Sequence, residues 1–216
     1  MKKLLLLVTV ISLIIHSGCK KADTTPPVIT LKGDNPFNLT INSEYNDPGY
    51  TATDNKDGDI TSKVTSSWKP AFNKDLTGKY ICTYVVSDAA GNKDTARRTV
   101  NVINSAGFLF GDYLNASGSC AITGPLSFDS RITVSSTTNN TLTIGNFGGF
   151  GVTLNAFYFP SGDSVSIPTG QSLSGTKSLV SSAVSISNHT NPTVLNINFT
   201  WTDGHNSDNC SSTYTK

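Results

Sequence analysis

KYICTYVVSDAAGNKDTARRTVNV, residues 79–102, is the clearest structural signal in this chain. In its first part, aromatic and apolar side chains fall at every second position: Tyr80, Cys82, Tyr84 and Val86. A period of two residues is typical of a β-strand with one buried face. Asp88 to Asn92 then supplies turn residues, because Asp and Asn bond their own backbone and Gly permits positive φ. The stretch therefore predicts two antiparallel strands joined by a short turn.

Shorter strands are predicted upstream of this hairpin, at 28–31, 39–41 and 50–52, with turn residues between them. Short strands at such spacing indicate a small β-sandwich. The motifs TPPVI (25–29), DPGYTATD (47–54), DGDIT (57–61) and RTVNV (98–102) stand in this order around the hairpin. Together they resemble the bacterial immunoglobulin-like domain of Bacteroidota surface lipoproteins and of one class of pesticidal crystal protein. The resemblance implies an immunoglobulin-like fold over residues 26–103, an extracellular setting and no catalysis.

Residues 104–107 are predicted to be a linker, and residues 108–216 a second all-β domain. The strand candidates are 108–114, 120–123, 131–135, 141–147, 151–159, 164–167, 183–187, 193–202 and 210–215. Leu195, Ile197, Phe199 and Trp201 alternate with polar residues, as expected for an antiparallel sheet covered on one face. We expect an antiparallel meander that closes into a β-barrel or forms a second β-sandwich. This half resembles C-terminal domains of uncharacterised Bacteroidota lipoproteins, which imply no activity.

The first residues have the features of an export signal. Lys2 and Lys3 precede an apolar run, residues 4–15, and small residues lead to Cys19. The run is shorter than the ~20 apolar residues that a membrane-spanning helix needs. The leader resembles the lipobox of bacterial lipoproteins, although His16 stands where that family usually has Leu or Val. The resemblance implies cleavage after residue 18, lipidation of Cys19, a tether at 19–25 and an outer-membrane location, on the cell surface or the periplasmic face.

The charge and the cysteines set further limits. The sequence has 16 Lys and Arg against 15 Asp and Glu, so no strongly basic face is expected and nucleic acid is not a predicted partner. An exported chain meets an oxidising environment in which disulfides persist. Cys120 and Cys210 lie near the two ends of the second half and are the predicted disulfide. Cys82 is predicted to be a buried thiol within its strand.

Acidic residues suggest one metal site. Asp54, Asp57 and Asp59 lie in a loop that does not fit the EF-hand pattern, since Val64 stands where a bidentate Glu is needed. In a sandwich this loop should lie at the same end as the Asp88 turn and the incoming Asp23. These carboxylates are therefore candidate calcium ligands. The alternative is that the Asp side chains cap turns and stay solvated. No other cofactor is predicted.

Catalytic groups are scarce. After the leader only His189 and His205 remain, without a nucleophile motif or zinc-ligand spacing. The chain is therefore not expected to be an enzyme, although carboxylates paired in space for glycan hydrolysis are the less favoured alternative. Tyr158 and Trp201 are candidate ligand-binding aromatics, with core packing as the other interpretation. We expect a membrane-anchored lipoprotein whose immunoglobulin-like stalk presents a β head that binds a glycan or surface protein, or else a structural adhesion component without a small ligand.

Overall fold

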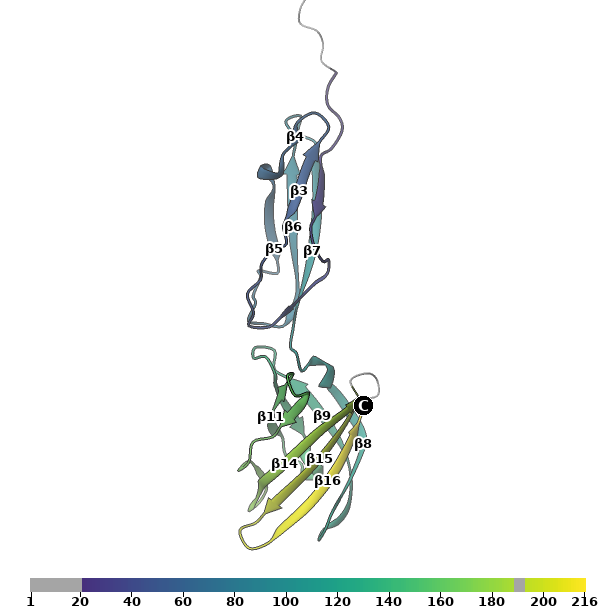
Figure 1. The fold of residues 1–216 in the computed structure, drawn as a ribbon, viewed down its shortest axis with the longest axis vertical. Helices are drawn as coiled ribbons and strands as arrows, with labels where there is room; N and C mark the ends of the chain where they lie inside the picture. The colour runs from purple at the N-terminus through teal and green to yellow at the C-terminus, as the bar shows by residue number, and fades with distance from the viewer. Residues whose placement is uncertain (1–20, 189–192) are drawn as a thin grey trace, which may run out of the picture. The chain divides into compact units, whose positions relative to one another are not determined.

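The structure, a computed structural model, describes residues 21–188 and 193–216 (Figure 1). Over these residues the regular structure consists of β-strands and three short 3-10 helices: η1 (Thr61–Lys63), η2 (Gly107–Leu109) and η3 (Phe147–Gly149). The predicted all-β class is confirmed. Within the described ranges, no helix combines the length and the apolar character that crossing a membrane would require.

Contacts divide the chain into two compact units. The first unit combines the chain up to Gly33 with Pro48–Ser67 and Thr83–Arg97. The second unit combines Asp34–Asp47, Trp68–Cys82 and Arg98–Lys216. The acidic residues predicted to bind calcium therefore lie in the first unit, and the whole C-terminal half lies in the second.

The immunoglobulin-like region contains two sheets. The three-stranded sheet has the order β1 (Val28–Leu31), β3 (Tyr50–Asp54), β4 (Gly58–Asp59). The four-stranded sheet has the order β2 (Phe37–Thr40), β7 (Lys93–Ile103), β6 (Gly78–Ser87), β5 (Thr65–Lys69). In β6 the residues at even positions, Tyr80 to Val86, are buried, as the alternation of the sequence predicts.

The C-terminal half forms a closed antiparallel β-barrel. Its strands follow the order β12-β11-β10-β9-β8-β16-β15-β14, and pairing of β12 with β14 closes the circle, while β13 adds to the edge of β14. The bounds are β8 (Gly111–Cys120), β9 (Gly124–Val134), β10 (Thr141–Gly145), β11 (Leu154–Phe159), β12 (Ser164–Ser166), β13 (Ser172–Ser174), β14 (Lys177–Asn188), β15 (Val194–Thr202) and β16 (Ser207–Thr215). The sequence was compatible with either a β-barrel or a second β-sandwich for this half, and the structure shows a β-barrel.

Apolar side chains fill the barrel. Leu109 from η2, Ile132 from β9 and Ile197 from β15 are fully buried in one continuous core. Tyr113 is also fully buried, and its hydroxyl donates a hydrogen bond of 2.9 Å to the Leu109 carbonyl oxygen. Burial raises the pKa of Tyr113 to about 12, so its phenol stays a donor at neutral pH. The described interior is thus a packed core, which directs the search for a site to the outside of the barrel.

Candidate functional site

The outer face of β14, β15 and β16 carries neutral polar side chains. In β15 the residues at odd positions point into the core and those at even positions, Asn196 to Thr202, point outward. In β16 Asn209 and Ser211 are exposed between buried neighbours. This pattern follows from the pleat, because successive side chains of a strand point to opposite faces. The sheet therefore presents rows of Ser, Thr and Asn to solvent.

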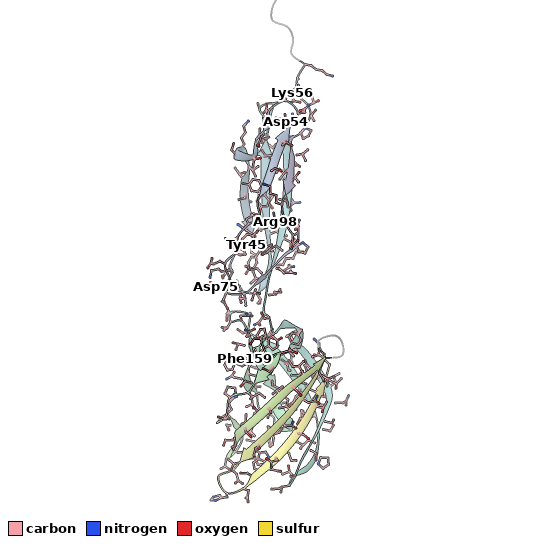
Figure 2. The ribbon with its side chains drawn as sticks, viewed as in Figure 1. Tyr45, Asp54, Lys56, Asp75, Arg98 and Phe159 are labelled. Atoms are coloured by element: carbon pink, nitrogen blue, oxygen red, sulfur yellow. A yellow bond between two sulfur atoms is a disulfide. The ribbon has the colours of Figure 1, made fainter. Side chains whose placement is uncertain are left out.

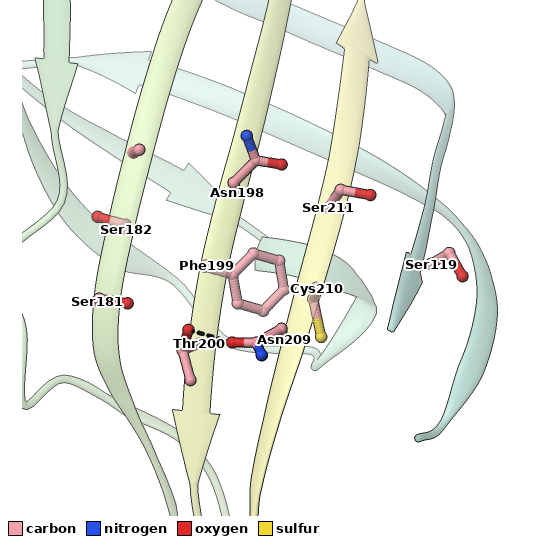
Figure 3. A pocket seen from close by; sticks show the side chains of 10 residues that line it. Ser119, Ser181, Ser182, Asn198, Phe199, Thr200, Asn209, Cys210 and Ser211 are labelled. Carbon is pink, nitrogen blue, oxygen red and sulfur yellow. Dashed lines mark hydrogen bonds between the residues drawn. The ribbon is translucent and has the colours of Figure 1, made fainter. Parts of the chain in front are cut away.

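A groove lies on this face and extends to the end of β8 (Figure 3). It is open to solvent and has a volume of about 450 Å³. Its lining residues are Ser119, Ser181, Ser182, Ala183, Asn198, Phe199, Thr200, Asn209, Cys210 and Ser211. Among these residues there is no ionisable acid, base or free thiol, because Cys210 is in a disulfide. The groove offers hydroxyl and amide groups without charge.

Several of these polar groups are not used by the fold. The Thr200 hydroxyl donates a 2.7 Å hydrogen bond to Oδ1 of Asn209, drawn as a dashed line in Figure 3. The side chains of Asn198, Ser119 and Ser211 have no hydrogen-bond partner within residues 21–188 and 193–216. An Asn side chain supplies two donors and an acceptor, and a Ser hydroxyl supplies one donor and two acceptor sites. The groove therefore has free capacity to donate and to accept hydrogen bonds.

A disulfide and a buried carboxylate hold one side of the groove. Cys120 of β8 stands directly opposite Cys210 of β16, and their sulfur atoms are bonded. Beyond Cys120, Asp208 accepts backbone N–H bonds from Ile122 at 2.9 Å and Thr123 at 3.0 Å. Burial raises the pKa of the Asp208 carboxyl, but these N–H groups and the Thr123 hydroxyl outweigh it, and the net pKa lies below the ordinary value. Both features link the β8–β9 turn to β16.

Tyr158 and Trp201, the aromatic residues predicted to bind a ligand, lie in the barrel core. Their exposed fractions are 8% and 5%. Phe150 packs edge-on to Trp201, and the ammonium of Lys177 lies 4.1 Å from the Trp201 ring centroid. The Tyr158 hydroxyl donates to the Asp163 carboxylate at 3.1 Å. Neither ring presents an open face on which a sugar could stack, so the structure favours the core-packing interpretation.

Three carboxylates converge in the first unit. One carboxylate oxygen from each of Asp23, Asp54 and Asp88 lies within 4.8 Å of the other two. Figure 2 labels Asp54 and its neighbour Lys56, whose Nζ lies 3.7 Å from the Asp23 carboxylate. Backbone N–H groups of Asp57 and Lys56 hold the pKa of Asp54 below its ordinary value. The structure thus brings together Asp54 and Asp88, two of the predicted calcium ligands, with Asp23, which was expected at the same end of the domain.

Asp57 and Asp59, the other two predicted ligands, lie outside this cluster. Asp57 accepts a 2.6 Å hydrogen bond from the backbone N–H of Ala89 and lies 3.7 Å from the Lys63 ammonium. Asp59 accepts the backbone N–H of Thr61, at the start of η1, at 2.9 Å. Both carboxylates stabilise turns, which was the alternative interpretation of the acidic loop.

The remaining sequence candidates are placed as follows. Cys19, the predicted lipidation site, and His189 lie outside the described residues. His205 is exposed in the β15–β16 turn, where its backbone N–H donates to the Asp203 carboxylate. Cys82 is a buried free thiol in β6. His205 and Cys82 do not line the groove, and among the described candidates only the disulfide-bonded Cys210 does. The sequence did not predict the groove.

Comparison with known proteins identifies one segment. Residues 29–102 match the family model of the Ig-like domain of bacterial surface proteins. No curated protein matches the chain. Among solved structures, a lipoprotein from Bacteroides thetaiotaomicron aligns at 14% identity and a TM-score of 0.36, over 87% of this chain and 99% of that one.

Two structures of Clostridium perfringens ZmpB are similar at 15% identity and a TM-score of 0.31. One holds the CBM51-2 and INT domains in complex with GlcNAc, and the alignment covers 88% of this chain and 48% of that one. The other holds the M60 catalytic domain with CBM51-1 and CBM51-2, with 89% and 21% covered. At such TM-scores none of these likenesses carries an argument about function. The family match shows that residues 29–102 form an Ig-like domain of the kind found in bacterial surface proteins.

Proposed function

We propose that this chain is a non-catalytic envelope lipoprotein whose β-barrel binds a neutral glycan in the groove over β14, β15, β16 and β8. The observation that carries this proposal is the chemistry of the groove. Apart from Ala183, Phe199 and Cys210, its lining side chains are hydroxyls and amides. Those of Asn198, Ser119 and Ser211 have no partner among the described residues. Sugar hydroxyls are both donors and acceptors, and such groups pair with them without a net charge.

The shape and the rigidity of the groove also favour this role. A volume of about 450 Å³ is within the ~300–1,000 Å³ typical of ligand sites. The groove lies on paired strands, and the Cys120–Cys210 disulfide fixes two of them. Because the paired strands already hold the backbone in place, ligand binding has to order only the side chains of the groove.

The rest of the chain would place this barrel at the envelope. In this proposal residues 1–18 are removed, Cys19 is lipidated, and residues 19–25 tether the chain to the outer membrane. Residues 26–103 are the Ig-like spacer, residues 104–107 the linker and residues 108–216 the binding domain. The spacer assignment is supported by the match of residues 29–102 to a surface-protein domain.

A glycan array tests the proposal, with the full chain, an Asn198→Ala variant and an Asn155→Ala variant. Asn155 is an exposed residue of β11 outside the groove, so it is a matched control for loss of one amide. We expect neutral oligosaccharides to bind the wild type, about tenfold weaker binding by Asn198→Ala, and unchanged binding by Asn155→Ala. Equal binding by the wild type and the Asn198→Ala variant would refute the assignment of the groove.

One observation favours a second candidate, an adhesion role toward a protein partner. Phe157 and Phe159 are 40% and 49% exposed on the same outer face of β11. Exposed aromatic side chains are enriched at protein interfaces. A Phe157→Ser and Phe159→Ser double variant that loses cell adhesion while keeping glycan binding would support this role.

A further inference from the structure

One residue of the acidic cluster in the first unit, Asp54, has a buried oxygen without a hydrogen-bond partner among the described residues. Asp54 ends β3 and is 9% exposed. Its Oδ1 accepts the backbone N–H groups of Lys56 at 2.8 Å and Asp57 at 2.9 Å. Its Oδ2 is buried and has no hydrogen-bond partner within residues 21–188 and 193–216. Burying a carboxylate oxygen without a partner is unfavourable, so this position favours a donor or a cation beyond those that the described residues supply.

The two other carboxylates come from separate segments and are held in place. Asp88 follows β6 and is 7% exposed, and its two oxygens accept the backbone and side-chain N–H groups of Asn92 at 2.8 Å and 2.7 Å. Asp23 belongs to the entering chain, and its carboxylate accepts the Thr25 N–H at 3.1 Å. The Asn92 amide also donates to the Asp23 carbonyl oxygen at 3.2 Å. Each carboxylate oxygen that bonds one N–H keeps a lone pair for another partner.

The charges of the cluster match a divalent cation. Three carboxylates carry three negative charges, and the Lys56 ammonium, 3.7 Å from Asp23, offsets one of them. Lys56 is itself 46% exposed in its side chain, which weakens its effect on the buried oxygens. A net charge of minus two therefore remains on the cluster. Part of it lies on the unpartnered oxygen of Asp54.

The distances and the donor atoms point to calcium. Oxygen ligands bind Ca²⁺ at about 2.3–2.6 Å, so two ligands of one ion are at most about 5 Å apart. The three carboxylates meet this limit with oxygens within 4.8 Å of one another. All the donors are hard oxygens, and the cluster has no thiolate or imidazole of the kind that favours zinc. Water can complete the six to eight ligands that calcium takes.

We propose that Asp23, Asp54 and Asp88 bind one calcium ion, which links the N-terminal segment to the β3 loop and the β6–β7 turn of the Ig-like domain. The ion would hold the point where the chain enters the domain. This proposal is independent of glycan binding by the barrel, because its three ligands belong to the other compact unit.

Isothermal titration calorimetry on the full, chelator-treated chain tests the proposal, with CaCl₂ as the titrant. We expect one Ca²⁺ per chain, and binding at least tenfold weaker for Asp54→Asn and for Asp23→Asn. Asn at position 54 can still accept the Lys56 and Asp57 N–H groups through its Oδ1, so the turn is preserved. Asp59→Asn is the matched control, because Asp59 belongs to the same loop but accepts the Thr61 backbone N–H and lies outside the cluster. The calcium affinity of this variant should stay within twofold of wild type.

Three results would overturn the proposal. The first is the absence of calcium binding by the wild type, which does not depend on the folding of any variant. The second is an equal loss of affinity in Asp23→Asn and Asp59→Asn. The third is an equal affinity for Mg²⁺ and Ca²⁺, because Mg²⁺ needs a smaller octahedral site and calcium would then not be the preferred ion.

Discussion

The Ig-like region and the barrel use polar residues in different ways. The Ig-like region buries charge: Arg98 is fully buried, and Asp54 and Asp88 are less than one-tenth exposed. The barrel carries uncharged Ser, Thr and Asn on the outside of β14, β15 and β16, above an apolar core. Buried charges must be paired, whereas exposed hydroxyls and amides are free to bind. The first arrangement suits a fixed joint that holds an ion, and the second suits reversible binding of a neutral ligand.

The largest expected effect is the loss of the barrel's disulfide. The two cysteines are 90 residues apart, and a crosslink over such a loop stabilises by about 4 kcal/mol, mainly through the unfolded chain. A Cys120→Ser and Cys210→Ser double variant should therefore lose about that free energy of unfolding in urea. Cys82→Ser, which removes the free thiol of the Ig-like region, is the control for sensitivity to reductant. If reductant destabilises the wild type and the double variant equally, this disulfide is not the source of the stability.

The next effect concerns the buried charge of the Ig-like region. Arg98 donates to the Asp34 carbonyl oxygen at 2.8 Å and lies 3.5 Å from the Asp47 carboxylate. Arg98→Met should cost about 2 kcal/mol, because it removes a fully buried guanidinium that donates to the Asp34 carbonyl oxygen, while its ion-pair partner Asp47 stays exposed to water. Arg131→Met should cost less than about 1 kcal/mol, because the barrel's Arg131–Asp112 pair is 55% exposed on each side. Urea unfolding of both variants measures the difference, and equal losses would remove this contrast between the two regions.

A smaller effect should appear in acid, at Asp208 of the barrel. Its pKa is lowered in the folded state, so its contribution to stability is present at neutral pH and is lost as the pH falls below about 4. Asp208→Asn should therefore lose less stability than the wild type between pH 7 and pH 3. Urea midpoints at the two pH values provide the measurement. A parallel loss in both proteins would mean that Asp208 does not contribute to the acid response.

The sequence predicted the parts of the fold that follow a simple pattern. The period of two in β6 and β15 matches the observed burial, since one face of each strand packs on a core. Strand β8 departs from the simple period of two. A strand was predicted at 108–114, whereas β8 runs from Gly111 to Cys120 and its pairing register shifts between Tyr113 and Ala116. Gly118 in this strand packs so closely that an added Cβ would lie 2.3 Å from the Ser211 carbonyl oxygen. Such a close approach depends on the partner strand and has no apolar signal in the sequence.

The candidate sites were predicted only in part for the same reason. Asp54 and Asp88 were recognised because acidic turns at one end of a sandwich are expected to converge. Asp57 and Asp59 lie outside the cluster because each accepts a hydrogen bond from a backbone N–H group. No sequence pattern reveals these hydrogen bonds. The groove was not predicted because Asn198 and Ser211 have the same pattern as any solvent-facing polar residues of a strand. They become neighbours only through the pairing of β15 with β16, in which Asn198 stands opposite Ser211.

The most direct test of the contrast between the two regions is a calorimetric titration of a neutral oligosaccharide into the full chain, with calcium and with chelator. The account predicts the same affinity for the sugar in both buffers, about tenfold weaker binding by Asn198→Ala, and wild-type binding by Asp54→Asn. Sugar binding that requires calcium and is lost in Asp54→Asn, but kept in Asn198→Ala, would contradict it.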